Sequence, residues 1–177
     1  MIMRRAALTT IALVLAGCAM QPPGPRTSEP GRHRASRPLT ESIDAATYIA
    51  QAGSIDLFVV RASELAQQRS ANSRLRNVAN ALMAGHKGLA AQLSFAGRRL
   101  NLLPGAAMLP QHEAMYDELA ASGAFDQTYI RQQRAIHGAA LSLHSDYARR
   151  GSSPTLRPVA TNAAAVERNH LALLRGL

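Results

Sequence analysis

The stretch from Arg74 to Asn101 constrains the fold more than any other, because its apolar residues recur every seven positions in two interleaved rows. One row is Leu75, Leu82, Leu89 and Ala96, and the other is Ala79, His86, Leu93 and Leu100. Rows of this kind place a buried stripe on one side of a helix, and the stripe needs partner helices. They also place the imidazole of His86 where the core of a helical bundle ordinarily has leucine.

Composition favours the same class of fold. The chain has no Trp, only 4% aromatic residues and few clusters of strand-forming residues, whereas Ala and Leu are abundant. This mixture is typical of packed helices. Its 177 residues suit one domain with appendages. We therefore expect an all-α protein with a single core.

Helical periodicity and stop signals divide the domain into four long helices and one short helix. The predicted long helices are 40–69, with Asp44 as a cap, 74–101, 125–150 and 154–175, the last with Pro154 in its first turn. A short acidic helix is expected at 110–123, in the connection between the second and third long helices. This order predicts a ferritin-like four-helix bundle of two antiparallel hairpins, occupying residues 41–177.

The N-terminus has the pattern of a bacterial export signal. Residues 1–17 contain Arg4 and Arg5 followed by an apolar run that is too short to span a bilayer as a mature helix. The Leu-Ala-Gly that precedes Cys18 resembles the lipobox of bacterial lipoproteins, in which the cysteine is lipidated. Cys18 is the only cysteine, so no intramolecular disulfide can form. The pattern predicts a lipid anchor at Cys18.

Residues 18–40 contain five Pro with several Arg and little apolar surface, which is typical of a tether. Because Ala19 follows Cys18, where Asp would favour retention at the inner membrane, we expect the periplasmic face of the outer membrane. The net charge of +9 is no nucleic-acid signature, because +5 of it lies in the first 40 residues and no basic stripe is interleaved with aromatic residues. We expect the membrane as a partner and no nucleic acid; no protein partner can be predicted.

Each long helix directs a titratable side chain inward. The expected inward rows carry Asp56 in the first helix and His86 in the second. In the third helix His137 and His144 flank the apolar row. In the fourth helix the expected row is Leu156, Val159, Ala163, Val166, His170 and Leu173. A set of three imidazoles and one carboxylate, Asp56, His86, His137 and His170, suits zinc, copper or iron.

The order of these motifs resembles a known bacterial family, the domain of unknown function 4142. The resemblance covers about residues 44–175 and is carried by Gly53, Asp56, His86, Leu103-Pro104, Phe125-Asp126-x-x-Tyr129, His137, Leu156-Arg157 and His170. It implies a ferritin-like fold in an exported or lipid-anchored protein without an established activity. This chain departs from the family in having Asp56 where Glu is usual, and Gly85 and Ile136 where an acidic residue often precedes the histidine.

Two interpretations of the inward polar residues remain open. In one, an envelope binding or stress-related module holds a transition metal with them; in the other, a structural or interaction lipoprotein uses them only as a hydrogen-bonded polar layer. A di-iron centre is not predicted, because only Glu167-x-x-His170 fits its paired motif. No catalytic residue can be assigned, since the chain has no Gly-x-Ser-x-Gly elbow and no phosphate-binding glycine loop. An enzyme is therefore the least favoured interpretation.

Overall fold

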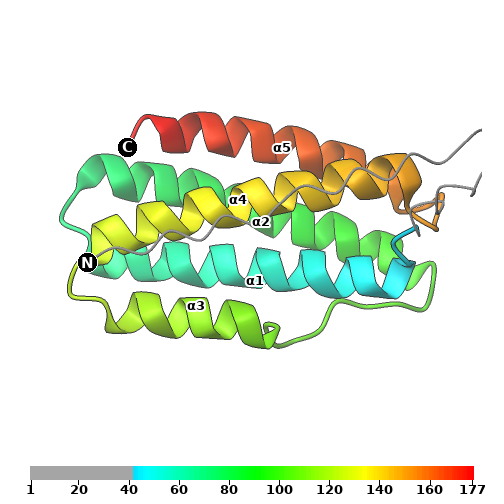
Figure 1. Ribbon diagram of the computed structural model, residues 1–177, viewed down its shortest axis with the longest axis horizontal. Coiled ribbons are helices and arrows are strands. Elements are labelled where there is room, and N and C mark those ends of the chain that lie inside the picture. Colours follow the sequence, from blue (N-terminus) through cyan, green and yellow to red (C-terminus); the bar gives the residue numbers. More distant parts are fainter. Residues whose placement is uncertain (1–41) are drawn as a thin grey trace, which may run out of the picture. The chain divides into compact units, whose positions relative to one another are not determined.

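The computed structural model describes residues 42–177, which form five α-helices and no strands (Figure 1). The helices are α1 (Ala45–Arg69), α2 (Ser73–Arg98), α3 (Pro110–Ala121), α4 (Phe125–Arg150) and α5 (Arg157–Arg175). The predictions for Cys18, the signal peptide and the tether fall outside the described residues. None of the helices from residue 42 onward is long and apolar enough to cross a bilayer.

The four long helices form a bundle of two antiparallel hairpins, α1–α2 and α4–α5 (Figure 1). α1 also packs against α4, and α2 packs against α5. Because α2 and α4 run in the same direction, the chain must return along the length of the bundle between them, and α3 lies in this connection. The predicted ferritin-like arrangement, with an extra helix in the connection, is confirmed.

Helix ends follow local signals. Asp44 caps α1 as predicted, since its carboxylate accepts a hydrogen bond from the backbone N–H of Thr47 at 2.9 Å. The last helix begins later than expected, at Arg157 rather than at Pro154. Pro158 is therefore the proline of the first turn, where its missing N–H has no consequence. Residues 154–156 form a turn before it.

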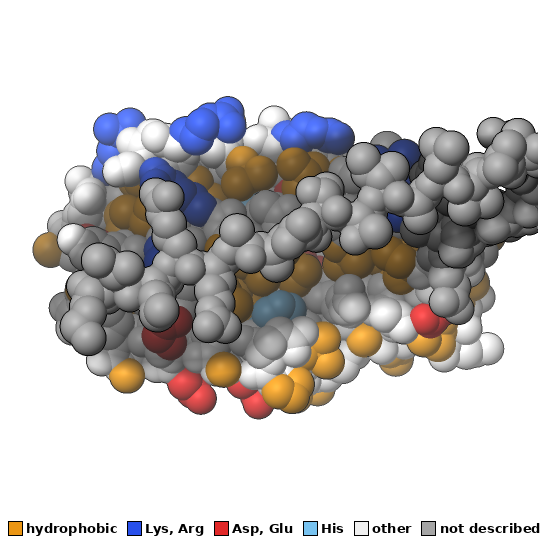
Figure 2. Space-filling model, in the orientation of Figure 1, with side chains coloured by type: hydrophobic (Ala, Val, Ile, Leu, Met, Phe, Trp, Pro, Cys, Tyr) orange, Lys and Arg blue, Asp and Glu red, His pale blue; other side chains and the backbone are white. Residues whose placement is uncertain are grey.

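Polar contacts at both ends hold α3 against the bundle. The hydroxyl of Ser54 in α1 accepts a hydrogen bond from the N–H of Leu109 at 2.7 Å and lies 2.6 Å from Nδ1 of His112. At the other end of α3, the guanidinium of Arg69 donates to the carbonyl oxygens of Ala120 and Ser122. Figure 2 shows that acidic side chains gather along the edge of the molecule over α3, and basic side chains along the opposite edge over α5.

The core consists of two apolar clusters, one towards each end of the bundle. The first cluster is built around Phe58, Leu75, Leu82 and Tyr129, and the second around Tyr48, Leu93 and Tyr147. His86 lies on α2 between Leu82 of the first cluster and Leu93 of the second, and it is completely buried. The middle of the bundle is therefore a polar layer enclosed by apolar packing.

The connection between α2 and α3 crosses α1 at Gly53, where a Cβ atom would lie 2.6 Å from Cβ of Pro104. This close approach explains why a glycine precedes Asp56 by three residues. We predict that Gly53→Ala lowers the free energy of unfolding by about 1–3 kcal/mol, because Pro104 must move. Chemical denaturation measures the effect.

Gly88→Ala is the matched control, since Gly88 also lies inside a helix and has nothing within 4 Å of its Cβ position. Alanine there should stabilise the protein by about 0.5–1 kcal/mol, because glycine weakens a helix interior. Equal effects of the two substitutions would contradict the contact with Pro104.

Candidate metal centre

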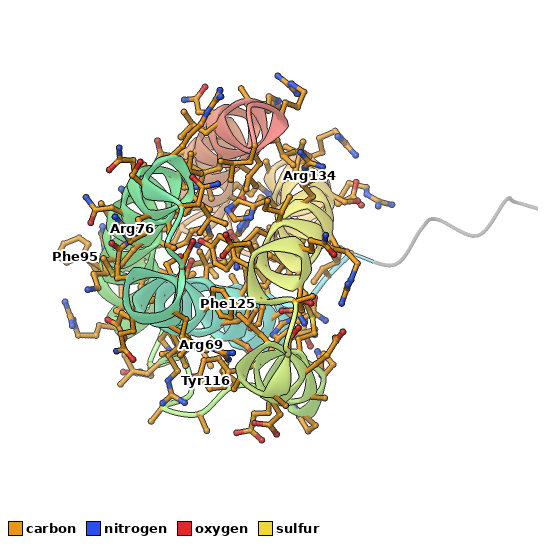
Figure 3. All side chains as sticks on the ribbon, turned by 90° about the vertical axis from the view of Figure 1, so that its left-hand side faces the viewer. Arg69, Arg76, Phe95, Tyr116, Phe125 and Arg134 are labelled. Atoms are coloured by element: carbon orange, nitrogen blue, oxygen red, sulfur yellow. The ribbon has the colours of Figure 1, made fainter. Side chains whose placement is uncertain are left out.

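Four buried side chains from three helices meet in the polar layer. They are His86 of α2, His137 of α4, and Glu167 and His170 of α5, and one ligand atom of each lies within 4.8 Å of the others. His86, His137 and Glu167 are 0% exposed, and His170 is 5% exposed. Figure 3, a view turned by 90° from Figure 1, shows nitrogen and oxygen atoms gathered inside the ring of helices. The sequence alone could not establish that these four residues lie at the same level along the bundle.

His86 and His137 are each held in place through Nδ1. Nδ1 of His86 lies 2.8 Å from a carboxylate oxygen of Asp56, and Nδ1 of His137 donates to the carbonyl oxygen of Gln133 at 2.8 Å. Their Nε2 atoms face each other at 3.3 Å. When Asp56 is ionised, both Nδ1 atoms carry the proton, so two nitrogen lone pairs face across this gap. The Nε2 lone pairs of His86 and His137 then need a proton or a metal ion between them.

Glu167 completes the group with a carboxylate that has no hydrogen-bond partner on either oxygen within the described part of the chain. Its Oε1 lies 3.6 Å from Nε2 of His86, and its Oε2 lies 3.9 Å from Nε2 of His137. Burial, and secondarily the charge of Asp56, raises the pKa of Glu167 to about 8. A fully buried carboxylate without a donor is costly, which makes Glu167 the least explained group of the interior.

His170 occupies a space that α2 leaves open. A Cβ atom at Gly85 would lie 2.5 Å from both Cε1 and Nε2 of the His170 ring. Nδ1 of His170 is buried and has no hydrogen-bond partner in the part of the protein that the structure describes. The absence of a side chain at residue 85, which appeared in the sequence as a lost acidic neighbour of His86, therefore gives His170 its place.

A second, outer set of polar groups lies next to Glu167. Nε2 of His144 is 3.8 Å from Oε1 of Glu167, and Nδ1 of His144 is 3.0 Å from the hydroxyl of Tyr48. The ring of Tyr48 stacks on Tyr147 with 3.8 Å between the centroids. Burial raises the pKa of the Tyr48 hydroxyl, which stays protonated and is able to donate to His144. His144 thus lies between Tyr48 and Glu167.

Burial keeps the imidazoles neutral, which is the form that binds metals. It lowers the pKa of His86 and His137 to about 3, and that of His144 and His170 to about 4. Burial also raises the pKa of Asp56 well above its ordinary value. Three neutral imidazoles and one carboxylate form a donor set typical of zinc, copper(II) and iron sites.

Of the four residues predicted as metal ligands, three come together and one has a different place. His86, His137 and His170 lie in the group. Asp56 contacts Nδ1 of His86, whereas Nε2 of the same ring faces the other ligand atoms. We therefore assign Asp56 to the orientation of His86, as carboxylates commonly orient histidine ligands, and not to direct ligation.

Sequence analysis did not place Glu167 in the candidate site, because half of the expected inward row of α5 was wrong, although Leu156, Ala163 and His170 are buried as predicted. Apolar character selected Val159, Val166 and Leu173, but Leu173 is exposed and the two valines are only half-buried. The buried row is Ala160, Ala163, Ala164, Glu167, His170 and Leu174. The spacing Glu167-x-x-His170, which places both side chains on one face of a helix, was the signal that could have identified Glu167.

A surface hollow leads to Asp56. It has a volume of about 350 Å³ and is lined by residues of α1, α2 and the connection, including Asp56, Lys87, Ala90 and Pro104. Asp56 itself is only 4% exposed. The hollow therefore ends at the carboxylate that orients His86.

The fold and the buried group define a class of protein: a four-helix bundle with a histidine–carboxylate cluster in its interior. Residues 29–177 match the family model described as Domain of unknown function (DUF4142). The chain belongs to this family, as the sequence motifs predicted. Among curated protein sequences, none matches this chain.

Solved structures share the fold at low sequence identity. "CopM in the Cu(II)-bound form" is 15% identical, with a TM-score of 0.64, and the match covers 77% of this chain and 96% of that one. A DUF305 fragment from Deinococcus radiodurans is 14% identical, with a TM-score of 0.65 and coverage of 75% and 93%. "CopM in the Ag-bound form" is 16% identical, with a TM-score of 0.61 and coverage of 75% and 93%. At these identities the comparison shows a common helical-bundle fold.

The lowered pKa of His144 predicts how stability depends on pH in the metal-free protein. An unfolded chain protonates this imidazole near pH 6.5, but the folded protein does so only near pH 4. The contribution of the neutral His144 imidazole to the free energy of unfolding is therefore complete above pH 6.5. It is lost by about 1.4 kcal/mol per pH unit as the pH falls from 6.5 towards 4. His144→Gln, which keeps a partner for Tyr48, should make the melting temperature fall less steeply between pH 7 and pH 4.

The comparison of His144→Gln with the unmodified protein isolates this one group, because Asp56 and Glu167 titrate in both. Both proteins are measured with a chelator present. Parallel curves of melting temperature against pH would contradict a buried, neutral His144.

Proposed function

We propose that this protein is a metal-binding module of the cell envelope that holds a divalent transition-metal ion between His86, His137, Glu167 and His170. The observation that carries the proposal is the carboxylate of Glu167, which is fully buried beside the imidazoles without a hydrogen-bond donor from residues 42–177. A polar layer that served only to fix the packing of the helices would be expected to satisfy this group. A bound cation satisfies it directly.

Charge balance favours a divalent ion. Asp56 and Glu167 are the two carboxylates of the layer, and their ion-pair partners among residues 42–177 are histidines, with no Lys or Arg. Burial raises the pKa of both groups, so they retain protons in the metal-free layer, and a metal ion that displaces these protons meets two negative charges. A divalent cation neutralises them in a place where an uncompensated charge is expensive.

The donor set and the similar structures guide the choice of metal. Imidazole and carboxylate ligands suit copper(II) and zinc better than softer ions, because the group contains no sulfur. CopM, which has a similar fold, has been solved with Cu(II) bound. Copper(II) is therefore the first metal to test, with zinc as the second.

We predict that the purified protein binds about one equivalent of Cu(II) or Zn(II), and that binding raises its melting temperature. Glu167→Gln and His86→Ala should each weaken the affinity at least about tenfold, because each removes a ligand. Titration calorimetry and elemental analysis after dialysis measure binding.

His112→Gln is the control for these substitutions. His112 is also a buried histidine, but it contacts Ser54 at the start of α3 and lies outside the ligand group. This variant should bind metal as tightly as the unmodified protein. Substoichiometric binding of every metal tested, with an unchanged melting temperature, would instead support a polar layer that only fixes the packing of the helices.

An envelope location is the second part of the proposal. It is supported by the charged and apolar pattern of residues 1–17 and by the Leu-Ala-Gly-Cys sequence that ends at Cys18. A lipidated cysteine with several acyl chains holds a protein firmly to a bilayer. We propose that the bundle is anchored to the periplasmic face of the outer membrane.

This anchor predicts the behaviour of a Cys18→Ala variant. In a bacterial host, the unmodified protein should incorporate labelled palmitate and sediment with outer-membrane vesicles. The Cys18→Ala variant should incorporate no palmitate and should no longer sediment with the vesicles, because its only thiol is lost. Labelling that persists in Cys18→Ala would exclude lipidation at this residue.

A further inference from the structure

The three imidazoles of the ligand group are not held equally. His86 is fixed by Asp56, and His137 is fixed by the carbonyl oxygen of Gln133. Hydrogen bonds of this kind set the orientation of a histidine ligand. For His170, by contrast, no hydrogen bond is present among the described residues, and its Nδ1 is buried without a partner. The ring of His170 is therefore the one whose orientation is least constrained by hydrogen bonds.

His170 is also the ligand nearest to solvent. It retains 5% exposure, whereas His86, His137 and Glu167 have none. Its Cε1–Nε2 edge lies over Gly85, at a position where the backbone of α2 carries no side chain. The ring thus packs against the backbone of α2 at Gly85, a residue that is itself only half-buried.

The hollow formed by α1, α2 and the connection is an alternative route by which an ion could reach the site, and Asp56 is part of its lining. An ion that arrived there would meet Asp56, but the ring of His86 would stand between it and the other ligand atoms, because Asp56 contacts Nδ1 and the group gathers around Nε2. His170, by contrast, is both partly exposed and a member of the group, so an ion that it binds is already in contact with the site. The geometry thus favours His170 over the hollow.

We propose that His170 is the exchange ligand of this site: its ring captures a divalent transition-metal ion from solvent beside Gly85 and delivers it to His86, His137 and Glu167. Release follows the same path in reverse. The inference rests on the proposed function, and it adds the route by which the buried site is loaded. The absence of a side chain at Gly85 allows the His170 ring to lie there.

Rates of metal binding test the proposal, because a capture ligand and an ordinary ligand affect different rate constants. Cu(II) is mixed with full-length protein in a stopped-flow instrument, and quenching of tyrosine fluorescence reports binding; the chain has no Trp. Competition with a chelator gives the dissociation rate. His170→Ala should lower the association rate at least about tenfold, whereas His137→Ala should act mainly by raising the dissociation rate.

Two further variants separate the routes while all four ligands are kept. Gly85→Ala places a Cβ atom in the space of the His170 ring and should also lower the association rate. Ala90→Leu fills part of the hollow at Asp56 and should leave the association rate within about twofold of the unmodified protein. Far-ultraviolet circular dichroism confirms that each variant is folded.

The outcomes distinguish this inference from the proposed function. If the unmodified protein binds neither Cu(II) nor Zn(II), the proposed function fails. If it binds metal, but His170→Ala and His137→Ala change the dissociation rate alike and leave the association rate unchanged, His170 is an ordinary ligand. If Ala90→Leu slows association and Gly85→Ala does not, the ion enters through the hollow and the inference is overturned.

Discussion

Burial of the Glu167 carboxylate among imidazoles is the constraint on which the interior of this bundle depends. This carboxylate receives no hydrogen bond from residue 42 onward, which is unfavourable in a buried site, so the groups around it must compensate for its charge or keep it protonated. The surrounding residues are arranged in a consistent way. Asp56 orients His86, the carbonyl oxygen of Gln133 orients His137, and His144 stands between Glu167 and Tyr48. The two apolar clusters enclose this layer from both ends.

Much of the fold could be predicted from the sequence because the signals are local. Seven-residue spacing identified the buried face of α2, and Asp56, which was expected on the inward face of the first helix, is buried in α1. The cap at Asp44 follows from side-chain chemistry, whereas α2 ends at Arg98, three residues before the predicted end at residue 101. The order of hairpin, long connection and hairpin then leaves few arrangements for four amphipathic helices.

The site was predictable only in part, since it depends on how far each helix is rotated. On α5, the larger apolar residues Val166 and Leu173 suggested the inward face, but the packed face is offset towards Glu167 and Leu174. Small residues such as Ala160 and Ala164 give a weak hydropathy signal, although they are what allows α5 to approach its neighbours closely. The height of each ligand along the bundle is a tertiary property, and no local pattern encodes it.

The gap at Gly85 links two distant positions of the chain. Because the His170 ring occupies the space that a side chain at residue 85 would need, the two positions cannot be substituted independently. A relative with an acidic residue before the histidine of α2 must seat the residue at position 170 in another way, or replace it. Within the DUF4142 family, the identities at these two positions should therefore vary together, and the pair would divide the family into members with different ligand sets.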